Sequence, residues 1–393
     1  MKFSVKRNLT ALYLVKIAKW MNLVMPIIVL FYKSNGLTMQ DIFLLQSAYS
    51  LTLMTLEIPT GYFADKVGRK TSIFIGSMLG FSGYLVYSFS FGFWQFVIAE
   101  VILGVSQSLV SGADSALLYD TLKAAKQNDK YIRLEGRITS IGNFGEAFAG
   151  IIGGLLAVSS LRTPFYVQTC VALIALPAAL MLMEPPIKSM QTKPGFRDVL
   201  SIMSNVLHGN LKLKWNTFFS AITGAATLTM AWFAQPYFGQ IKLPVSMYGV
   251  VWALLNLCVG IAAVFAWRIE KKMGPARTVT LFTLMIFLSF VILAWVPWPV
   301  GLLVIIIFYI ARGLATPILR NYINIITTSE VRATVLSVRN FLIRLIFAIT
   351  GPVWGWVTDK YSLQMAIIIA GLIYGILAMV SLFFFLKHKT YEP

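Results

Sequence analysis

Apolar segments long enough to cross a lipid bilayer recur along the whole chain. A hydrocarbon core of about 30 Å requires roughly 20 consecutive apolar residues in a helix. Such segments cover residues 9–32, 42–64, 71–91, 94–118, 134–158, 163–183, 215–238, 246–267, 278–296, 299–319, 334–357 and 362–386. The sequence therefore predicts twelve transmembrane helices, and the rest of its 393 residues suffices for loops but not for a separate soluble domain.

The charge composition agrees with a membrane protein. Charged residues make up 12% of the chain, whereas a typical soluble protein contains about 25%. With the N-terminus in the cytoplasm, every lysine and arginine in the loops lies on the cytoplasmic side except Lys33, Arg162, Lys242 and Lys360. This positive-inside bias predicts an even number of spans with both termini in the cytoplasm. It also accounts for the formal net charge of +18 without a nucleic-acid partner.

The residue types that commonly bind metals suggest no site. Cys170 and Cys258 lie in apolar spans, where cysteine behaves as a small buried hydrophobe. His208 and His388 lie in predicted cytoplasmic segments and lack the spacing of a zinc site. We therefore expect neither a metal nor another cofactor. The first apolar segment is a full span without a small-residue cleavage site, so we expect no removable signal peptide.

The longest hydrophilic stretch divides the chain into two halves. It begins at Glu184, where Pro185 and Pro186 end the sixth span. Within it, apolar residues at helical spacing predict an amphipathic helix on the inner membrane surface, formed by Phe196, Val199, Leu200, Met203 and Leu207. We therefore predict a six-helix bundle over residues 1–184, a linker over 185–214 and a second six-helix bundle over 215–393.

A weak internal repeat supports this division. Arg137 in the fifth span is followed by Gly150 and Gly153, and Arg339 in the eleventh span is followed at the same two distances by Pro352 and Gly355. Repeated halves are a common architecture of secondary transporters.

The loop between the second and third spans carries a specific motif. It reads Gly61-Tyr62-Phe63-Ala64-Asp65-Lys66-Val67-Gly68-Arg69-Lys70. Its glycines permit a short turn, and its carboxylate can pair with the adjacent bases or lie at a helix N-terminus. This loop resembles the signature loop of the major facilitator superfamily, G-x-x-x-D-x-x-G-R-K. A decayed counterpart, 268–274, follows the eighth span.

The resemblance implies an all-α membrane protein whose two six-helix bundles alternate access to a central cavity. It also implies that the loop is a conformational latch, formed by Gly61, Asp65, Gly68, Arg69 and Lys70. Asp120, at the cytoplasmic end of the fourth span, is the expected partner of Arg69 or Lys70.

Two further segments bear on the direction of transport. The fifth span contains a glycine-rich stretch, 145–154, that is similar to the antiporter motif of the superfamily, although Ala149 and Gly150 replace its Gly-Pro pair. Such a glycine-rich face also permits close helix packing without any role in export. In the fourth span, Glu100 precedes Gly104 by four residues, where drug antiporters often carry an arginine. The first segment favours export, and the second argues against a standard drug-antiporter mechanism.

Ionisable residues inside the spans mark the candidate pathway. Each costs about 2.5–3.5 kcal/mol at a helix centre, so they usually face protein or water. They are Lys16, Lys19, Glu57, Glu100, Asp114, Arg137, Glu146, Arg312, Arg339 and Arg344. The third, sixth, ninth and twelfth spans contain none, and the resemblance implies that these four are the outer helices.

Depth within the spans separates the candidate roles. We expect the midplane residues Lys19, Glu146, Arg312 and Arg344 to bind substrate, with Trp232 and Tyr237 of the seventh span as an aromatic wall. The alternatives are internal ion pairing for the charges and helix packing for the aromatic residues. Lys16, Arg137 and Arg339 lie close enough to the cytoplasm to extend to the membrane interface instead. The candidate proton carriers are Glu146, Glu57, Glu100 and Asp114, since burial and nearby cations shift carboxyl groups in opposite directions.

The sequence thus predicts a monomeric secondary transporter in the bacterial cytoplasmic membrane, with membrane lipid, protons and a small molecule as its partners. The leading hypothesis is proton-coupled export of a small amphipathic compound with an anionic or zwitterionic group. The alternatives are proton-coupled uptake of an organic anion and, in a different class, a lipid scramblase or channel. We expect no enzymatic activity.

Overall fold

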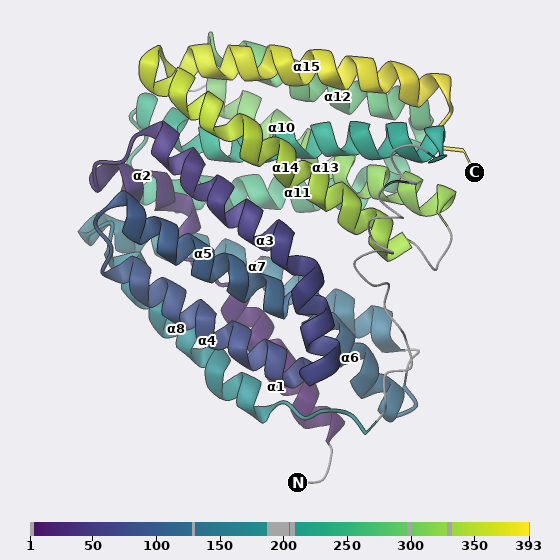
Figure 1. Cartoon of the computed structure of the whole chain (residues 1–393). Helices are drawn as coiled ribbons and strands as arrows, with labels where there is room; N and C mark the ends of the chain where they lie inside the picture. The colour runs from purple at the N-terminus through teal and green to yellow at the C-terminus, as the bar shows by residue number, and fades with distance from the viewer. Residues whose placement is uncertain are drawn as a thin grey trace. The chain divides into compact units, whose positions relative to one another are not determined.

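The computed structural model describes residues 4–127, 130–186, 204, 209–296, 300–327 and 332–392. Within these ranges the regular elements are helices, and no strand occurs (Figure 1). The amphipathic helix predicted between Phe196 and Leu207 lies outside the described residues.

The first six predicted spans are occupied by helices in the expected order. These are α1 (Val5–Trp20), the 3-10 helix η1 (Met25–Ile27), α2 (Ile28–Ser34), α3 (Met39–Val67), α4 (Arg69–Ser88), α5 (Phe93–Val110), α6 (Ala113–Ala124), α7 (Tyr131–Ser159) and α8 (Thr163–Met181). The first span consists of α1, η1 and α2, and the fourth consists of α5 and α6.

The last six predicted spans each contain one helix. They are α10 (Leu211–Gln240), α11 (Val245–Met273), α12 (Pro275–Leu293), α13 (Val300–Ile326), α14 (Arg332–Lys360) and α15 (Leu363–Lys387). In the described part of the chain, ten stretches are long and apolar enough to cross a membrane, and α4 and α7 occupy the predicted third and fifth spans. The predicted all-α membrane fold is confirmed.

The chain divides into two compact units. Unit 1 comprises Met1–Leu37, Ala48–Lys193 and Pro244–Ala253, and unit 2 comprises Thr38–Ser47, Pro194–Leu243 and Leu254–Pro393. The bundle boundaries expected from the sequence, at 184 and 215, remain a prediction. Each unit is described below by itself.

The first and fourth spans are broken, and each break has a local cause. In the first span, α1 ends at Trp20 and η1 begins only at Met25, with Pro26 in its first turn. Proline is favoured in the first turn of a helix, where its missing N–H would have no partner within the helix, so Pro26 marks the start of a new helical segment. In the fourth span, Ser111 is extended and Gly112 has a φ of +80°, which glycine adopts without steric cost. Each break leaves free helix ends inside a membrane-spanning stretch, as in many transporter binding sites.

Small residues hold the helices of each unit close together. In unit 1, α4 lies beside α5 and α8 (Figure 1). A Cβ atom added at Gly76 would lie 2.6 Å from Val110 Cγ2, so α4 and α5 approach closely at this point. In unit 2, a Cβ atom at Gly375 on α15 would lie 2.3 Å from the ring of Phe287 on α12. Close approach at small residues is a main source of packing energy between helices in lipid.

Candidate transport site

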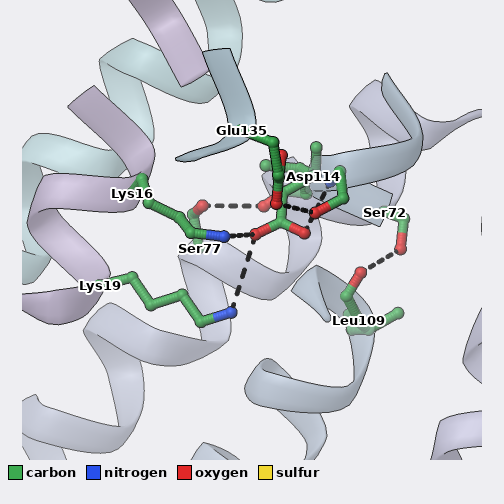
Figure 2. Close-up of polar contacts among 9 residues, drawn as sticks. Lys16, Lys19, Ser72, Ser77, Leu109, Asp114 and Glu135 are labelled. Atoms are coloured by element: carbon green, nitrogen blue, oxygen red, sulfur yellow. Dashed lines mark hydrogen bonds and ion pairs between the residues drawn. The ribbon is translucent and has the colours of Figure 1, made fainter. Parts of the chain in front are cut away.

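A cluster of three charged side chains joins the two broken spans within unit 1. Lys16 and Lys19 come from the last turns of α1, and Asp114 comes from the first turn of α6. Figure 2 shows both lysine side chains directed towards the Asp114 carboxylate. Lys16 Nζ lies 2.9 Å from Asp114 Oδ2, and Lys19 Nζ lies 4.0 Å from the same oxygen. We name these three residues the lysine–aspartate cluster.

Local structure explains why the cluster forms. A spacing of three residues places Lys16 and Lys19 on one face of α1. Asp114 lies at the N-terminus of α6, where the helix dipole favours a negative charge. The backbone N–H of Ser115 donates to Asp114 Oδ1 at 2.8 Å. The break at Gly112 therefore both creates this helix N-terminus and positions the carboxylate.

The cluster is largely removed from solvent. The side chains of Lys16, Lys19 and Asp114 are 13%, 22% and 9% exposed. Buried charges are tolerated when they are paired, and here two cations share one carboxylate oxygen. A second carboxylate lies close by, because Ser115 Oγ donates to Glu135 Oε1 at 2.7 Å (Figure 2). Lys19 is the less tightly held cation, so it is the group best suited to bind an added anion.

Two of the three cations that could have extended to the membrane interface have partners inside the protein instead. Lys16 does not extend to the membrane interface, because its Nζ pairs with Asp114. Arg339 is buried on α14, where its Nε donates to Ser220 Oγ and its Nη1 donates to Asn340 Oδ1 at 3.2 Å. Hydrogen-bond partners inside the protein replace the water that each cation would otherwise reach. Arg137, by contrast, is exposed.

The remaining candidate carboxylates of unit 1 lie on three different helices. Glu57 on α3 and Glu146 on α7 are half-buried. Glu100 on α5 is buried, and its Oε1 accepts a hydrogen bond of 2.8 Å from the hydroxyl of Tyr32. The structure therefore brings Asp114 to the lysines and Glu100 to a tyrosine. Neither pairing follows from the spacing of these residues in the sequence.

The candidate substrate residues of the second half all belong to unit 2. Arg312 is half-buried, with its guanidinium carbon 5.7 Å from the centre of the Tyr309 ring, and Arg344 is half-buried on α14. Trp232 and Tyr237 on α10 are buried. A cavity that these residues would share with Lys19 and Glu146 of unit 1 remains a prediction.

The signature loop is held by contacts within unit 1. Arg69 pairs with Asp120, the partner expected from the sequence, and its Nη2 lies 3.9 Å from Asp65 Oδ1. Gly68, the N-cap residue just before α4, has a φ of +117°. The backbone N–H of Lys70 donates to Glu184 Oε1 at 2.6 Å, so the glutamate before the two prolines caps α4.

Gly61 lies in open space, and the second-half counterpart of the signature loop keeps part of its structure. A Cβ atom added at Gly61 would meet no heavy atom within 4 Å, so the glycine is not required by packing in this structure. Gly274, the N-cap residue of α12, has a φ of +82°, which matches the positive φ of Gly68 before α4. Glu270, four residues before Gly274, accepts a hydrogen bond of 3.0 Å from the Tyr322 hydroxyl. The second loop therefore keeps the glycine turn and an acid, with a tyrosine as the partner.

Sequence reasoning missed Tyr32, Glu135 and Glu184 as polar partners. Tyr32 resembles an ordinary apolar residue of the first span, and Glu135 lies at a predicted span boundary. Glu184 caps α4 from 114 residues away, so no local pattern in the sequence pointed to it.

Comparisons with known proteins agree with these observations. A family model described as Major Facilitator Superfamily matches residues 15–346. The quinolone resistance protein NorA of Staphylococcus aureus (strain MSSA476) is 27% identical over 208 residues, which are 53% of this chain and 50% of that protein. The chain thus spans about half the length of the curated relatives it matches.

Solved structures share the fold over nearly the whole chain. The nucleoside transporter NupG aligns with a TM-score of 0.80 and 16% identity, covering 98% of this chain and 99% of that one. A D-xylose-proton symporter aligns with a TM-score of 0.76 and 14% identity, covering 99% and 98%. These likenesses establish the arrangement of helices.

Proposed function

The chain belongs to the major facilitator superfamily, and from this premise we propose that it exports a small amphipathic compound with a zwitterionic or anionic group in exchange for protons. The observation that carries the proposal is the lysine–aspartate cluster at the breaks in the first and fourth spans. The partial similarity to a quinolone resistance protein, NorA, supports the direction of transport, because export of a compound confers resistance to it.

The cluster suits a compound with both charges. An anionic group fits beside Lys19, which lies 4.0 Å from Asp114 and is the less tightly held of the two lysines. An ammonium group fits beside the Asp114 carboxylate, which accepts charge-assisted hydrogen bonds. A proton on Asp114 and an ammonium group on the substrate would then compete for the same carboxylate. Mutually exclusive binding of proton and substrate is the thermodynamic requirement for exchange.

The same geometry defines the alternative function. A purely anionic compound would bind better when Asp114 is protonated, because both lysines would then be free to contact it. Proton and substrate would bind together, which is the requirement for uptake by symport. The excess of lysine over aspartate in the cluster favours this second candidate when the substrate has no cationic group.

The remaining parts of the proposal concern the latch and the orientation. We assign the role of a conformational latch to Gly61, Asp65, Gly68, Arg69, Lys70 and Asp120. We place both termini in the cytoplasm, on the basis of the positive-inside distribution of loop lysines and arginines. The bacterial cytoplasmic membrane is the proposed location.

The test is transport by the purified full chain in proteoliposomes under an imposed pH gradient. The compounds are zwitterionic, anionic and cationic amphiphiles of similar size. We expect proton-driven export of a zwitterion and weaker binding as the pH falls. Stronger binding of an anion at low pH would instead establish symport.

Paired variants identify the site. Lys19→Ala should weaken binding roughly 10- to 100-fold, the equivalent of one charge-assisted contact. Lys33→Ala, which removes an exposed lysine of α2, is the matched control and should bind normally. Equal binding by the two variants, or wild-type protein without pH-driven flux, would refute the proposal.

A further inference from the structure

A second polar cluster lies within unit 1, around the buried carboxyl group of Glu100. The Tyr32 hydroxyl of α2 donates to Glu100 Oε1 at 2.8 Å. The Tyr87 hydroxyl of α4 is hydrogen-bonded to the Tyr32 hydroxyl and also contacts Glu100. We name Tyr32, Tyr87 and Glu100 the tyrosine–glutamate cluster.

Aromatic rings enclose this cluster. The ring of Phe96 lies 5.3 Å from that of Tyr32, and the ring of Phe165 lies 5.4 Å from that of Tyr87. All four rings are almost fully buried, and Glu100 is 4% exposed. Removing an ionised carboxylate from water is so costly that such a group tends to take up a proton instead.

The other titratable groups near Glu100 come from neighbouring helices. Tyr84 of α4 interacts with both Glu100 and Tyr49 of α3. A cation nearby is Arg162, which precedes α8; its guanidinium carbon lies 5.0 Å from the centre of the Phe31 ring, and its Nη1 donates to the backbone carbonyls of Ser88 and Ser90. Three of the groups that interact with the carboxyl, Tyr32, Tyr84 and Tyr87, are therefore phenols, and a phenol can donate to either the charged or the protonated form.

The position of the cluster relates it to the proposed transport site. Tyr32 lies on α2 and the lysines lie on α1, on opposite sides of the break in the first span. Glu100 lies on α5 and Asp114 lies on α6, on opposite sides of the break in the fourth span. Both polar clusters therefore join the two broken spans, the lysine–aspartate cluster between α1 and α6 and the tyrosine–glutamate cluster between α2 and α5.

Glu100 also lies near the side that we expect to face outward. It is the eighth residue of α5, which begins at Phe93. At a rise of 1.5 Å per residue, its Cα atom is about 10 Å from that end of the helix. A proton that enters an exporter from outside would reach this carboxyl before it reaches Asp114.

We propose that Glu100 is a proton-binding site on the outward side of unit 1, joined to the lysine–aspartate cluster by the two broken spans. This inference rests on the proposed function. A proton taken from the external water binds the Glu100 carboxylate, and the bond from Tyr32 changes from charge-assisted to neutral, which weakens it. The strength of the contact between α5 and α2 changes with this bond. By thermodynamic reciprocity, if proton binding at Glu100 alters substrate binding at the lysine–aspartate cluster, substrate binding there alters proton binding at Glu100.

The test separates proton coupling from substrate binding. Glu100→Gln keeps the shape of the side chain but cannot bind a proton. In proteoliposomes the rate of its pH-driven export should be at least about tenfold lower than that of wild type. Its rate of substrate exchange at equal pH on both sides should stay within about twofold of wild type. Asp41→Asn, which removes another carboxylate on the side expected to face outward, is the matched control and should retain both activities.

A direct measurement of protons complements the flux. When the pH of the protein in detergent is lowered rapidly, wild-type protein should take up about one proton more per molecule than Glu100→Gln. Normal pH-driven export by Glu100→Gln, or equal proton uptake by the two proteins, would overturn the inference. So would loss of exchange together with export in a variant of normal thermal stability.

Further outcomes separate failure of this inference from failure of the proposed function. If Glu100→Gln does not fold, Tyr32→Phe retains the carboxyl group and should alter the pH dependence of export, and an unchanged pH profile would overturn the inference. Wild-type protein without pH-driven flux would overturn the proposed function and this inference together. Failure of Glu100→Gln to differ from a pH-driven wild type overturns the inference alone.

Discussion

Replacing Asp114 by asparagine removes a carboxylate that both lysines of the cluster contact. Lys16 Nζ lies 2.9 Å and Lys19 Nζ lies 4.0 Å from the same carboxylate oxygen, and their side chains are 13% and 22% exposed. Asparagine keeps the volume and can still accept the bond from the Ser115 N–H. The change therefore isolates the loss of charge and leaves two largely buried ammonium groups without this partner.

The distances order the three single substitutions by their cost. Breaking a buried ion pair by removing one partner costs about 3–5 kcal/mol, so we expect this loss for Asp114→Asn. Lys16→Met should cost about 1.5–3 kcal/mol, because Asp114 keeps Lys19 nearby but loses its one short charge-assisted bond to a lysine. Lys19→Met should cost less than about 1 kcal/mol, since its contact is long.

A double-mutant cycle tests this reasoning. The free energy of unfolding is measured by tryptophan fluorescence during denaturant unfolding in mixed detergent micelles. Lys16→Met combined with Asp114→Asn should cost less than the sum of the single changes by at least about 1.5 kcal/mol, because replacing both partners removes the unpaired charge. Additive costs, or equal costs for Lys16→Met and Lys19→Met, would show that the short bond does not stabilise the cluster.

Further predictions concern glycines and a second carboxylate. Gly68→Ala should destabilise the protein by about 1–2 kcal/mol and slow transport, because the residue has a φ of +117°, whereas Gly61→Ala, in open space, should leave thermal stability unchanged. Gly153→Ala should be severely destabilising in a thermal unfolding assay, because its Cβ atom would lie 1.8 Å from Leu23 O. If Glu146 carries a proton, Glu146→Gln should lose pH-driven flux and keep substrate exchange, and full pH-driven flux would refute that role.

The breaks in the first and fourth spans could not be predicted from the hydrophobicity of the sequence. The residues responsible, Pro26 and Gly112, are visible there. Each lies inside an apolar segment of normal length, and proline and glycine are tolerated in continuous transmembrane helices. Hydrophobicity averaged over a whole span therefore does not distinguish a broken helix from an intact one.

The sequence by itself determined the helical spans, their order and the family. These follow from local properties, because the thickness of the bilayer sets the length of each apolar segment and the signature loop is contiguous from Gly61 to Lys70. The loop even indicated Asp120 as the partner of Arg69, since the resemblance supplied the neighbouring helix end.

Only the tertiary structure decided which charges meet. Lys16 and Asp114 are 98 residues apart, Tyr32 and Glu100 are 68 apart, and Arg339 reaches Ser220 across 119 residues. Depth along a span, which the sequence does reveal, fixes a residue's height in the membrane but not the direction in which its side chain points. That direction depends on helix rotation and on the breaks, which are set by packing against neighbours distant in the chain.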